Sequence, residues 1–170
     1  MKTGEKTSLL IVDDDAPIRK LLERVALRAG FEVGLAKDGI EALEMLAQKP
    51  YSIAIVDLMM PRLSGYDLVQ RISLMNPRPV IIVATANADV SKIDDTLVRR
   101  VIRKPFDVQA VAEALIDTAR HVAEKQAAAE KGVPIAPAES ATIRVSAKDF
   151  EEKNQEQKKN DPQQPDAKLS

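Results

Sequence analysis

Short apolar runs alternate with stretches of helical periodicity from Ser8 to about Val122. Runs of four to six residues bounded by polar or turn-forming residues are typical of buried strands. Five such runs are present, at 9–12, 31–36, 52–56, 80–85 and 99–103. Alternation of strands with helices is typical of a parallel sheet covered by helices, so the pattern predicts an α/β domain.

Helical spacing of apolar residues predicts a helix after each strand. The helices with clear amphipathic faces begin near Ala16, Gly39, Tyr66 and Asp107. The first is expected to be capped by Asp15 and to end at Gly30, because these residue types favour those positions. The last runs past Ala119 and can continue to Lys131. Residues 88–100 offer few apolar positions in a charged stretch, so the fourth of five helices is expected to be short or irregular.

The composition fits one domain with a full core and an appendage. The chain has 170 residues, of which 45% are hydrophobic, and its 25 basic residues nearly balance its 26 acidic ones. This balance gives no indication of binding to nucleic acid or to an acidic membrane. The absence of cysteine excludes disulfides, thiolate nucleophiles and cysteine-rich zinc sites. No run is long enough to span a membrane, so a soluble cytoplasmic protein is expected.

The composition changes beyond about Lys125 to Ala, Glu, Lys, Gln and Pro, without sustained periodicity. Such segments bury too little apolar surface to fold alone. The expected organisation is a single domain over 7–122, a helix extension over 123–131 and a disordered low-complexity tail over 132–170. The apolar islands in the tail are "ATIRV" and Phe150, which are either a docking motif or without function.

Polar side chains follow four of the five predicted strands. Asp13 and Asp14 follow the first, Asp57 the third, Thr85 ends the fourth and Lys104 follows the fifth. A flavodoxin-like, doubly wound sheet with strand order 2-1-3-4-5 places these four strands side by side. Ligands of such sheets bind at the carboxyl ends of the strands, where these five residues would meet. The second strand contributes no obvious ligand.

These residue types suit a metal-assisted phosphate site. The carboxylate of Asp57 is a competent nucleophile toward phosphorus, but it must approach an anionic phosphoryl group. Mg²⁺ prefers oxygen ligands, which carboxylates after the first strand, Asp57 itself and a loop carbonyl such as that of Met59 could supply. The Lys104 ammonium and the Thr85 hydroxyl suit phosphate oxygens. The acidic cluster is therefore interpreted as a divalent metal site.

The motifs "IVDDD", "VDLMMP", "ATA" and "KPF", in this order, resemble the receiver domain of bacterial response regulators over about 7–122. The resemblance implies a two-component phosphorelay in which Asp57 accepts phosphate from a phosphohistidine on a sensor histidine kinase or phosphotransfer protein. Such a switch catalyses its own phosphotransfer and dephosphorylation. Its downstream target would be another protein, because no DNA-binding domain and no membrane segment are expected.

The resemblance also assigns roles by position. Asp13 and Asp14 would hold Mg²⁺ together with Asp57, with the Met59 carbonyl as a further ligand. Thr85 and Lys104 would sense the phosphorylated state. A cis peptide bond is implied before the proline that follows Lys104.

Three features depart from the family pattern. Val101 stands where receivers usually carry an aromatic residue in the fifth strand. The connection between Thr85 and Lys104 is a little short, and the usual Gly-Ala before the fifth strand is absent. These departures agree with a shortened fourth helix and leave the output surface as the least transferable feature.

Two other functions remain open. A phosphohydrolase of the haloacid dehalogenase type would use Asp13 as its nucleophile, but its pattern needs Thr or Val in place of Pro17. It also needs an acidic pair after the lysine, whereas Asp94 and Asp95 precede Lys104. The third hypothesis is a receiver fold that serves only as a binding scaffold.

Some residues also have simple structural interpretations. His121, the only histidine, is expected to be a partly solvated residue near the end of the last helix. Gly65 is expected to supply turn geometry. The arginines Arg99, Arg100 and Arg103 would form either a docking patch or a charged edge that prevents strand aggregation.

Overall fold

The computed structural model describes residues 6–86 and 90–132. The strands are β1 (Ser8–Val12), β2 (Glu32–Ala36), β3 (Ile53–Val56), β4 (Val80–Thr85) and β5 (Val98–Arg103). The helices are α1 (Ala16–Arg28), α2 (Gly39–Gln48), α3 (Gly65–Ser73) and α4 (Val108–Glu130), with a 3₁₀ turn, η1 (Val90–Lys92). All five predicted strands are present within a few residues of their expected bounds.

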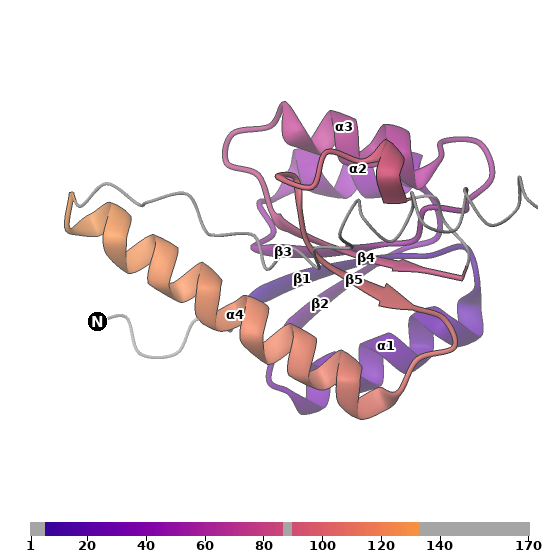
Figure 1. Cartoon of the computed structure of the whole chain (residues 1–170), viewed down its shortest axis with the longest axis horizontal. Coiled ribbons are helices and arrows are strands. Elements are labelled where there is room, and N and C mark those ends of the chain that lie inside the picture. Colours follow the sequence, from indigo (N-terminus) through magenta and orange to yellow (C-terminus); the bar gives the residue numbers. More distant parts are fainter. Residues whose placement is uncertain (1–5, 87–89, 133–170) are drawn as a thin grey trace, which may run out of the picture. The chain divides into compact units, whose positions relative to one another are not determined.

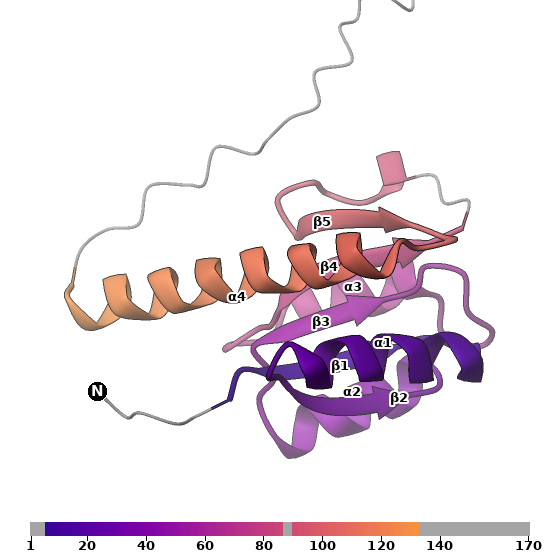
Figure 2. The ribbon, with the colours of Figure 1, turned by 90° about the horizontal axis from the view of Figure 1, so that it is seen from below.

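The strands form one parallel sheet in the order β2-β1-β3-β4-β5, which confirms the predicted order. Helices α1 and α4 cover one face of the sheet, and α2 and α3 cover the other (Figures 1 and 2). This three-layer arrangement leaves the carboxyl ends of the strands at one edge, where the connecting loops converge.

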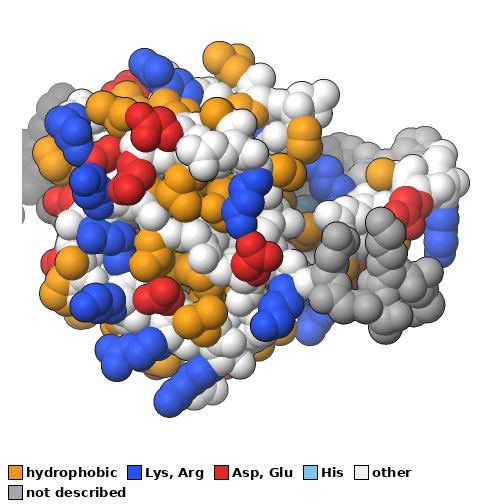
Figure 3. All heavy atoms as spheres, turned by 180° about the vertical axis from the view of Figure 1, so that it is seen from behind, with side chains coloured by type: hydrophobic (Ala, Val, Ile, Leu, Met, Phe, Trp, Pro, Cys, Tyr) orange, Lys and Arg blue, Asp and Glu red, His pale blue; other side chains and the backbone are white. Residues whose placement is uncertain are grey.

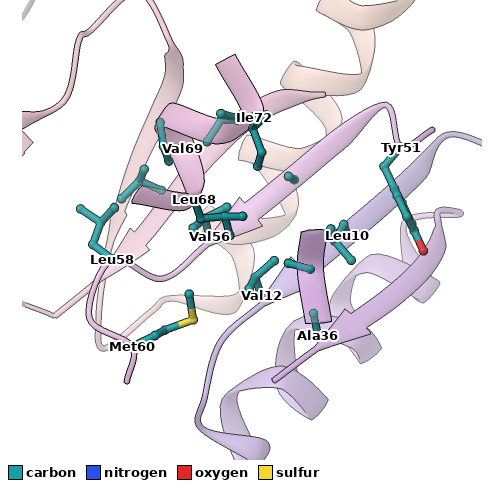
Figure 4. Packing of buried hydrophobic residues seen from close by; sticks show 14 residues of the cluster. Leu10, Val12, Ala36, Tyr51, Val56, Leu58, Met60, Leu68, Val69 and Ile72 are labelled. Atoms are coloured by element: carbon teal, nitrogen blue, oxygen red, sulfur yellow. The ribbon is translucent and has the colours of Figure 1, made fainter. Parts of the chain in front are cut away.

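The side chains of successive residues of the central strands pack in two separate hydrophobic cores, one on each face of the sheet. On β1, Leu10 and Val12 face α2 and α3, whereas Leu9 and Ile11 face α1 and α4. The first of these cores is shown in Figure 4, where Val56 lies against Leu68 of α3. Strands buried on both faces consist almost wholly of apolar residues, which explains the continuous apolar runs in the sequence.

The strand register brings the strand ends level with one another. Val12 pairs with Val56, and Thr85 pairs with Arg103. The backbone ladder continues one residue further, because the Asp57 amide donates to the Val12 carbonyl (2.9 Å) and the Lys104 amide to the Thr85 carbonyl (2.9 Å). The residues that follow these strands are therefore fixed by main-chain hydrogen bonds.

The connection between β4 and β5 is irregular, as expected for the fourth helix, and its described part shows even less helix than a short α-helix. Among the described residues 90–97 it contains only the turn η1 and no α-helix. The Asp94 carboxylate accepts from both the amide (2.9 Å) and the hydroxyl (2.6 Å) of Thr96, and such local bonds compete with helix formation. Ile93 and Leu97 still pack against the core on the α2/α3 side.

A register shift in β5 explains the position of two arginines. Ile81 pairs with Val98 but Ile82 pairs with Arg100, so Arg99 is an additional residue in the strand. Arg99 and Arg100 both reach Asp117 of α4, with nitrogen–oxygen distances of 3.7 and 2.9 Å. Two of the three arginines for which a docking patch or a protective charged edge was considered are therefore already paired within the chain.

Helix α4 is longer than the sheet requires. Val122 is its last buried residue, and the side chains from 123 to 130 are exposed or partly exposed. None of the helices within 6–86 and 90–132 has the length and apolarity to cross a bilayer. The face shown in Figure 3 intersperses charges of both signs with hydrophobic side chains. Beyond its first residue, Gly132, the expected tail, including "ATIRV" and Phe150, lies outside the described residues.

Gly65 has a different role from the predicted turn geometry. It is the first residue of α3, and a Cβ atom there would overlap the Asp57 carbonyl oxygen and lie 2.5 Å from Leu58 Cα. The Gly65 amide donates to the Leu58 carbonyl (3.0 Å). The glycine is required because the start of α3 packs directly on the backbone that carries Asp57.

Replacing Gly65 with alanine is expected to destabilise the protein by about 1–3 kcal/mol, because a backbone atom rather than a flexible side chain must move. The loss appears despite the roughly 1 kcal/mol that alanine gains over glycine in a helix. Urea unfolding measures it. Gly34→Ala is the matched control, since the atoms nearest to its Cβ would belong to the side chains of Tyr51 and Met45 rather than to the backbone. A loss no larger than that of the control would contradict this packing argument.

Candidate functional site

The Lys104 ammonium joins two carboxylates at the ends of neighbouring strands. Lys104 Nζ lies 2.6 Å from Asp13 Oδ2 and 2.7 Å from Asp57 Oδ2. Both carboxylates are buried, and the lysine side chain is 13% exposed. Charge-assisted bonds of this length are among the stronger hydrogen bonds in proteins. The ammonium therefore offsets the repulsion between two acids that the sheet register brings together.

The second oxygen of each carboxylate accepts a main-chain hydrogen bond. Asp13 Oδ1 accepts from the Asp15 amide (2.9 Å), and Asp57 Oδ1 accepts from the Met59 amide (3.0 Å). The Arg19 guanidinium donates to the Asp13 carbonyl (2.6 Å). Both carboxylates are thus fixed at two points, so their orientation is set before any ligand binds.

The acidic cluster has a donor set that fits a divalent cation. Oxygen atoms of Asp13, Asp14 and Asp57 all lie within 4.8 Å of one another, and Asp14 is exposed. Opposite ligands of an octahedral magnesium ion stand about 4 Å apart, so small side-chain movements would suffice. Three carboxylates with one ammonium leave an excess of negative charge. The chemistry and spacing of these residues are suitable for Mg²⁺.

The Thr85 hydroxyl is buried without a hydrogen-bond partner among the described residues. Leaving a buried hydroxyl unsatisfied costs about 1–3 kcal/mol. Thr85 ends β4, and its carbonyl accepts the Lys104 amide at 2.9 Å, so it lies beside the strand end that carries the ammonium. The Thr85 hydroxyl can therefore donate a hydrogen bond to a ligand oxygen that is bound at the carboxyl edge of the sheet.

The protonation equilibria follow from burial and from the ion pairs. Burial raises the pKa of Asp13 above its ordinary value of 3.8, against the opposing effects of Lys104 and the Asp15 amide. Burial alone would lower the pKa of Lys104, but hydrogen bonds to Asp13 and Asp57 hold it above its ordinary value of 10.5. The lysine is consequently charged at neutral pH.

The predicted site residues are largely brought together. Asp13, Asp14, Asp57 and Lys104 form one cluster, with Thr85 on the strand between those that carry Asp57 and Lys104. The Met59 amide contacts Asp57, while its side chain is 60% exposed.

Two further expectations are borne out by local geometry, and a third, on His121, is borne out in part. Asp15 caps α1, accepting from the Ile18 amide (3.2 Å), and the peptide bond before Pro105 is cis. His121 is partly exposed, as expected, but it lies in the middle of α4 rather than near its end. Burial lowers its pKa, aided by the charges of Arg99 and Lys125. The histidine is therefore neutral at physiological pH.

Sequence reasoning missed three residues near the site. Arg19 supports the Asp13 backbone, and Arg62 forms an ion pair with the buried Asp38. The signal for Asp38 was its position after β2 and before a helix, which is typical of an N-cap. No sequence signal marked Arg62, because its partner Asp38 follows β2, a strand that seemed to contribute no ligand.

A parallel five-stranded sheet with acids and a lysine at its carboxyl edge defines a class of α/β proteins that bind ligands at strand ends. The model of the response regulator receiver domain matches residues 9–116, so the chain belongs to this family, which functions in two-component systems. This finding confirms the resemblance inferred from the motifs.

Curated relatives carry similar sequences in longer chains. The chain is 43% identical over 91 residues to a probable transcriptional regulator, ycf27, of Guillardia theta, covering 54% of this chain and 35% of that protein. It is 36% identical over 113 residues to response regulator GtcR of Aneurinibacillus migulanus, covering 62% and 45% respectively. The chain thus matches less than half the length of these relatives.

A solved structure shares the same fold. A two-component transcriptional regulator, AraC, from Clostridium phytofermentans is 27% identical, with a TM-score of 0.64. The match covers 72% of this chain and 99% of that structure.

Lys104→Met is expected to reduce the free energy of unfolding by roughly 3 kcal/mol at neutral pH, because it leaves two buried carboxylates without their cation. Lys104 favours the ionised form of Asp13, so its contribution is lost as the pH falls through the raised pKa of Asp13. The difference from wild type should therefore shrink as the pH falls from neutral through the raised pKa of Asp13.

Urea unfolding at several pH values measures this difference. Lys49→Met, which breaks the exposed Lys49–Glu32 pair, is the control and should change stability little. A stability difference for Lys104→Met that stays constant from neutral to acidic pH would contradict the assignment.

Proposed function

We propose that Asp57 accepts a phosphoryl group, in the presence of Mg²⁺, from a phosphohistidine on a sensor histidine kinase or phosphotransfer protein, and that this switches a protein-interaction surface. The observation that carries the proposal is the position of the Lys104 ammonium, which bonds to both Asp57 and Asp13. A carboxylate attacks an anionic phosphoryl group only if cations offset the repulsion, and one cation is already held at the acceptor.

Each residue of the cluster has a proposed task. Asp13, Asp14 and Asp57 would hold Mg²⁺, with the Met59 carbonyl as a further ligand. When bound, the ion supplies positive charge to the phosphoryl oxygens. The Met59 amide and Lys104 orient the Asp57 carboxylate, and the buried site limits access of water to it.

Transfer replaces a nitrogen–phosphorus bond with an oxygen–phosphorus bond. A carboxylate oxygen of Asp57 attacks phosphorus while the bond to the partner's imidazole breaks, and the leaving imidazole nitrogen takes a proton from water. The product is an acyl phosphate on Asp57. Attack of water on this acyl phosphate returns inorganic phosphate and the free carboxylate.

The phosphorylated state would be sensed by Thr85 and Lys104. A phosphoryl group on Asp57 brings acceptor oxygens to the edge where the Thr85 hydroxyl lacks a partner. It also competes for the ammonium that now joins Asp13 to Asp57. Such a change in charge and hydrogen bonding at the ends of β4 and β5 would bias the surface formed by these strands and α4.

The organisation of the chain follows the same proposal. The receiver domain would span 7–122, the exposed end of α4 would form an extension over 123–131, and 132–170 would form a tail. Output would pass through a protein partner in the cytoplasm.

Incubation with acetyl phosphate and Mg²⁺, followed by mass spectrometry, tests the proposal. One phosphoryl group per chain is expected on Asp57, and Asp57→Asn should abolish labelling because the nucleophilic carboxylate is replaced by an amide. Asp67→Asn, which changes an exposed carboxylate in the first turn of α3, should label normally.

Each alternative gives a different result in the same experiment. A phosphoryl group found on Asp13 would support a phosphohydrolase of the haloacid dehalogenase type. Absence of labelling in folded wild-type protein with Mg²⁺ present would support a binding scaffold. Either result would overturn the assignment of Asp57 as the acceptor.

A further inference from the structure

Arg62, in the loop between Asp57 and α3, has a left-handed backbone conformation with φ of 69°. Residues other than glycine, asparagine and aspartate rarely adopt this conformation, because the side chain crowds the backbone. Conformations of this kind persist only where the surrounding structure holds them in place. The position therefore requires a contact that keeps arginine there.

That contact is an ion pair with Asp38. Arg62 Nη2 bonds to Asp38 Oδ2, and the arginine side chain is 58% exposed while the aspartate side chain is 3% exposed. Asp38 Oδ1 accepts from the amides of Ile40 (2.9 Å) and Glu41 (3.0 Å), which caps α2. Asp38 is thus a fixed, buried anchor between β2 and α2.

The Glu41 amide and, after it, the Arg62 charge hold the pKa of Asp38 below its ordinary value, against the effect of burial. The aspartate is consequently ionised at neutral pH. The pair with Arg62 therefore joins two full charges, one of them removed from water.

The same loop touches the anchor at a second point. A Cβ on Gly39, the residue after Asp38, would lie 2.9 Å from Leu63 Cδ2, so the Leu63 side chain packs directly on the start of α2. Because β1 lies between β2 and β3, these contacts join the segments that follow the two strands on either side of β1, the strand that precedes Asp13. The loop is therefore held across the edge where the acidic cluster forms.

We propose that Arg62 is a positioning residue that acts through this loop: its ion pair with Asp38 holds the Met59 main chain beside the Asp57 carboxylate and so sets the affinity of the acidic cluster for a divalent cation. The inference rests on the proposed function for the identity of the cation site. Met59 is three residues from Arg62, its amide bonds to Asp57 Oδ1, and its exposed side chain provides little packing of its own.

Mg²⁺ titration of the full chain, followed by amide chemical shifts in NMR spectra, tests this role without measuring phosphotransfer. Arg62→Gln removes the charge, and Asp38→Asn keeps an oxygen that can cap α2. Each variant should weaken Mg²⁺ binding by roughly threefold to tenfold. This loss of affinity is no larger than the one usually seen when groups that orient metal ligands are changed. The double variant should bind no more weakly than the weaker single variant, because both changes remove one interaction.

A second variant separates positioning from general stability. Arg62→Gly also removes the ion pair, but glycine adopts the left-handed backbone readily. Its free energy of unfolding should therefore exceed that of Arg62→Gln, while its Mg²⁺ affinity should be as low or lower. Lys49→Gln, which breaks an exposed ion pair with Glu32, is the control and should leave Mg²⁺ affinity unchanged.

The proposal is overturned if folded Arg62→Gln binds Mg²⁺ as wild type does, if the two single effects add, or if affinity follows stability through the series. Unfolding of every Arg62 and Asp38 variant, or a wild-type chain that binds no Mg²⁺, would also overturn it. Acetyl phosphate labelling of wild type separates a failure of this proposal from a failure of the proposed function. If Asp57 is labelled but the Arg62 substitutions leave Mg²⁺ affinity unchanged, only the positioning role is disproved. If the variants bind Mg²⁺ more weakly but wild type is not labelled on Asp57, only the role of Asp57 as acceptor is disproved.

Discussion

The ammonium of Lys104 is the interaction on which the site depends. It is the group that allows Asp13 and Asp57, both buried, to stand at adjacent strand ends. Two like charges at neighbouring strand ends repel each other, and removing each of them from water adds to the free-energy cost of folding. With the ammonium in place the carboxylates are oriented, and the remaining negative charge attracts a further cation.

Main-chain geometry makes this arrangement possible. Parallel pairing continues one residue beyond the strands and fixes the backbone of Asp57 and Lys104. Gly65 lets α3 begin directly on the backbone of Asp57, so the helix and the acceptor share one rigid junction. The chemistry at the edge is thus supported by the two cores beneath it, where apolar side chains alternate between the faces of the sheet.

Much of this could be predicted from sequence because parallel sheets follow few rules. Apolar runs predicted the strands, and the flavodoxin-like strand order, one of the common orders for such sheets, brought Asp13, Asp57 and Lys104 to one edge. The β4–β5 connection was less predictable, because short-range bonds such as that from Asp94 to Thr96 decide whether a helix forms.

The tertiary contacts made by individual residues could not be predicted, because no pattern in the sequence indicates them. The close approach at Gly65 and the pairing of Arg62 with Asp38 depend on how two loops meet in space. A glycine in a loop is equally typical of a turn, and an arginine in a loop is usually solvated. These contacts became evident only from the arrangement of α2 and α3 on the same face of the sheet.

Anomalous diffraction from crystals soaked in Mn²⁺, a substitute for Mg²⁺ with the same preference for oxygen ligands, tests the central claim most directly. The account predicts one peak in the acidic cluster, in contact with the carboxylates of Asp13 and Asp57, with Lys104 still bonded to at least one of them. A cluster that keeps the geometry described above and shows no peak, or a peak bound only by residues elsewhere, would contradict it.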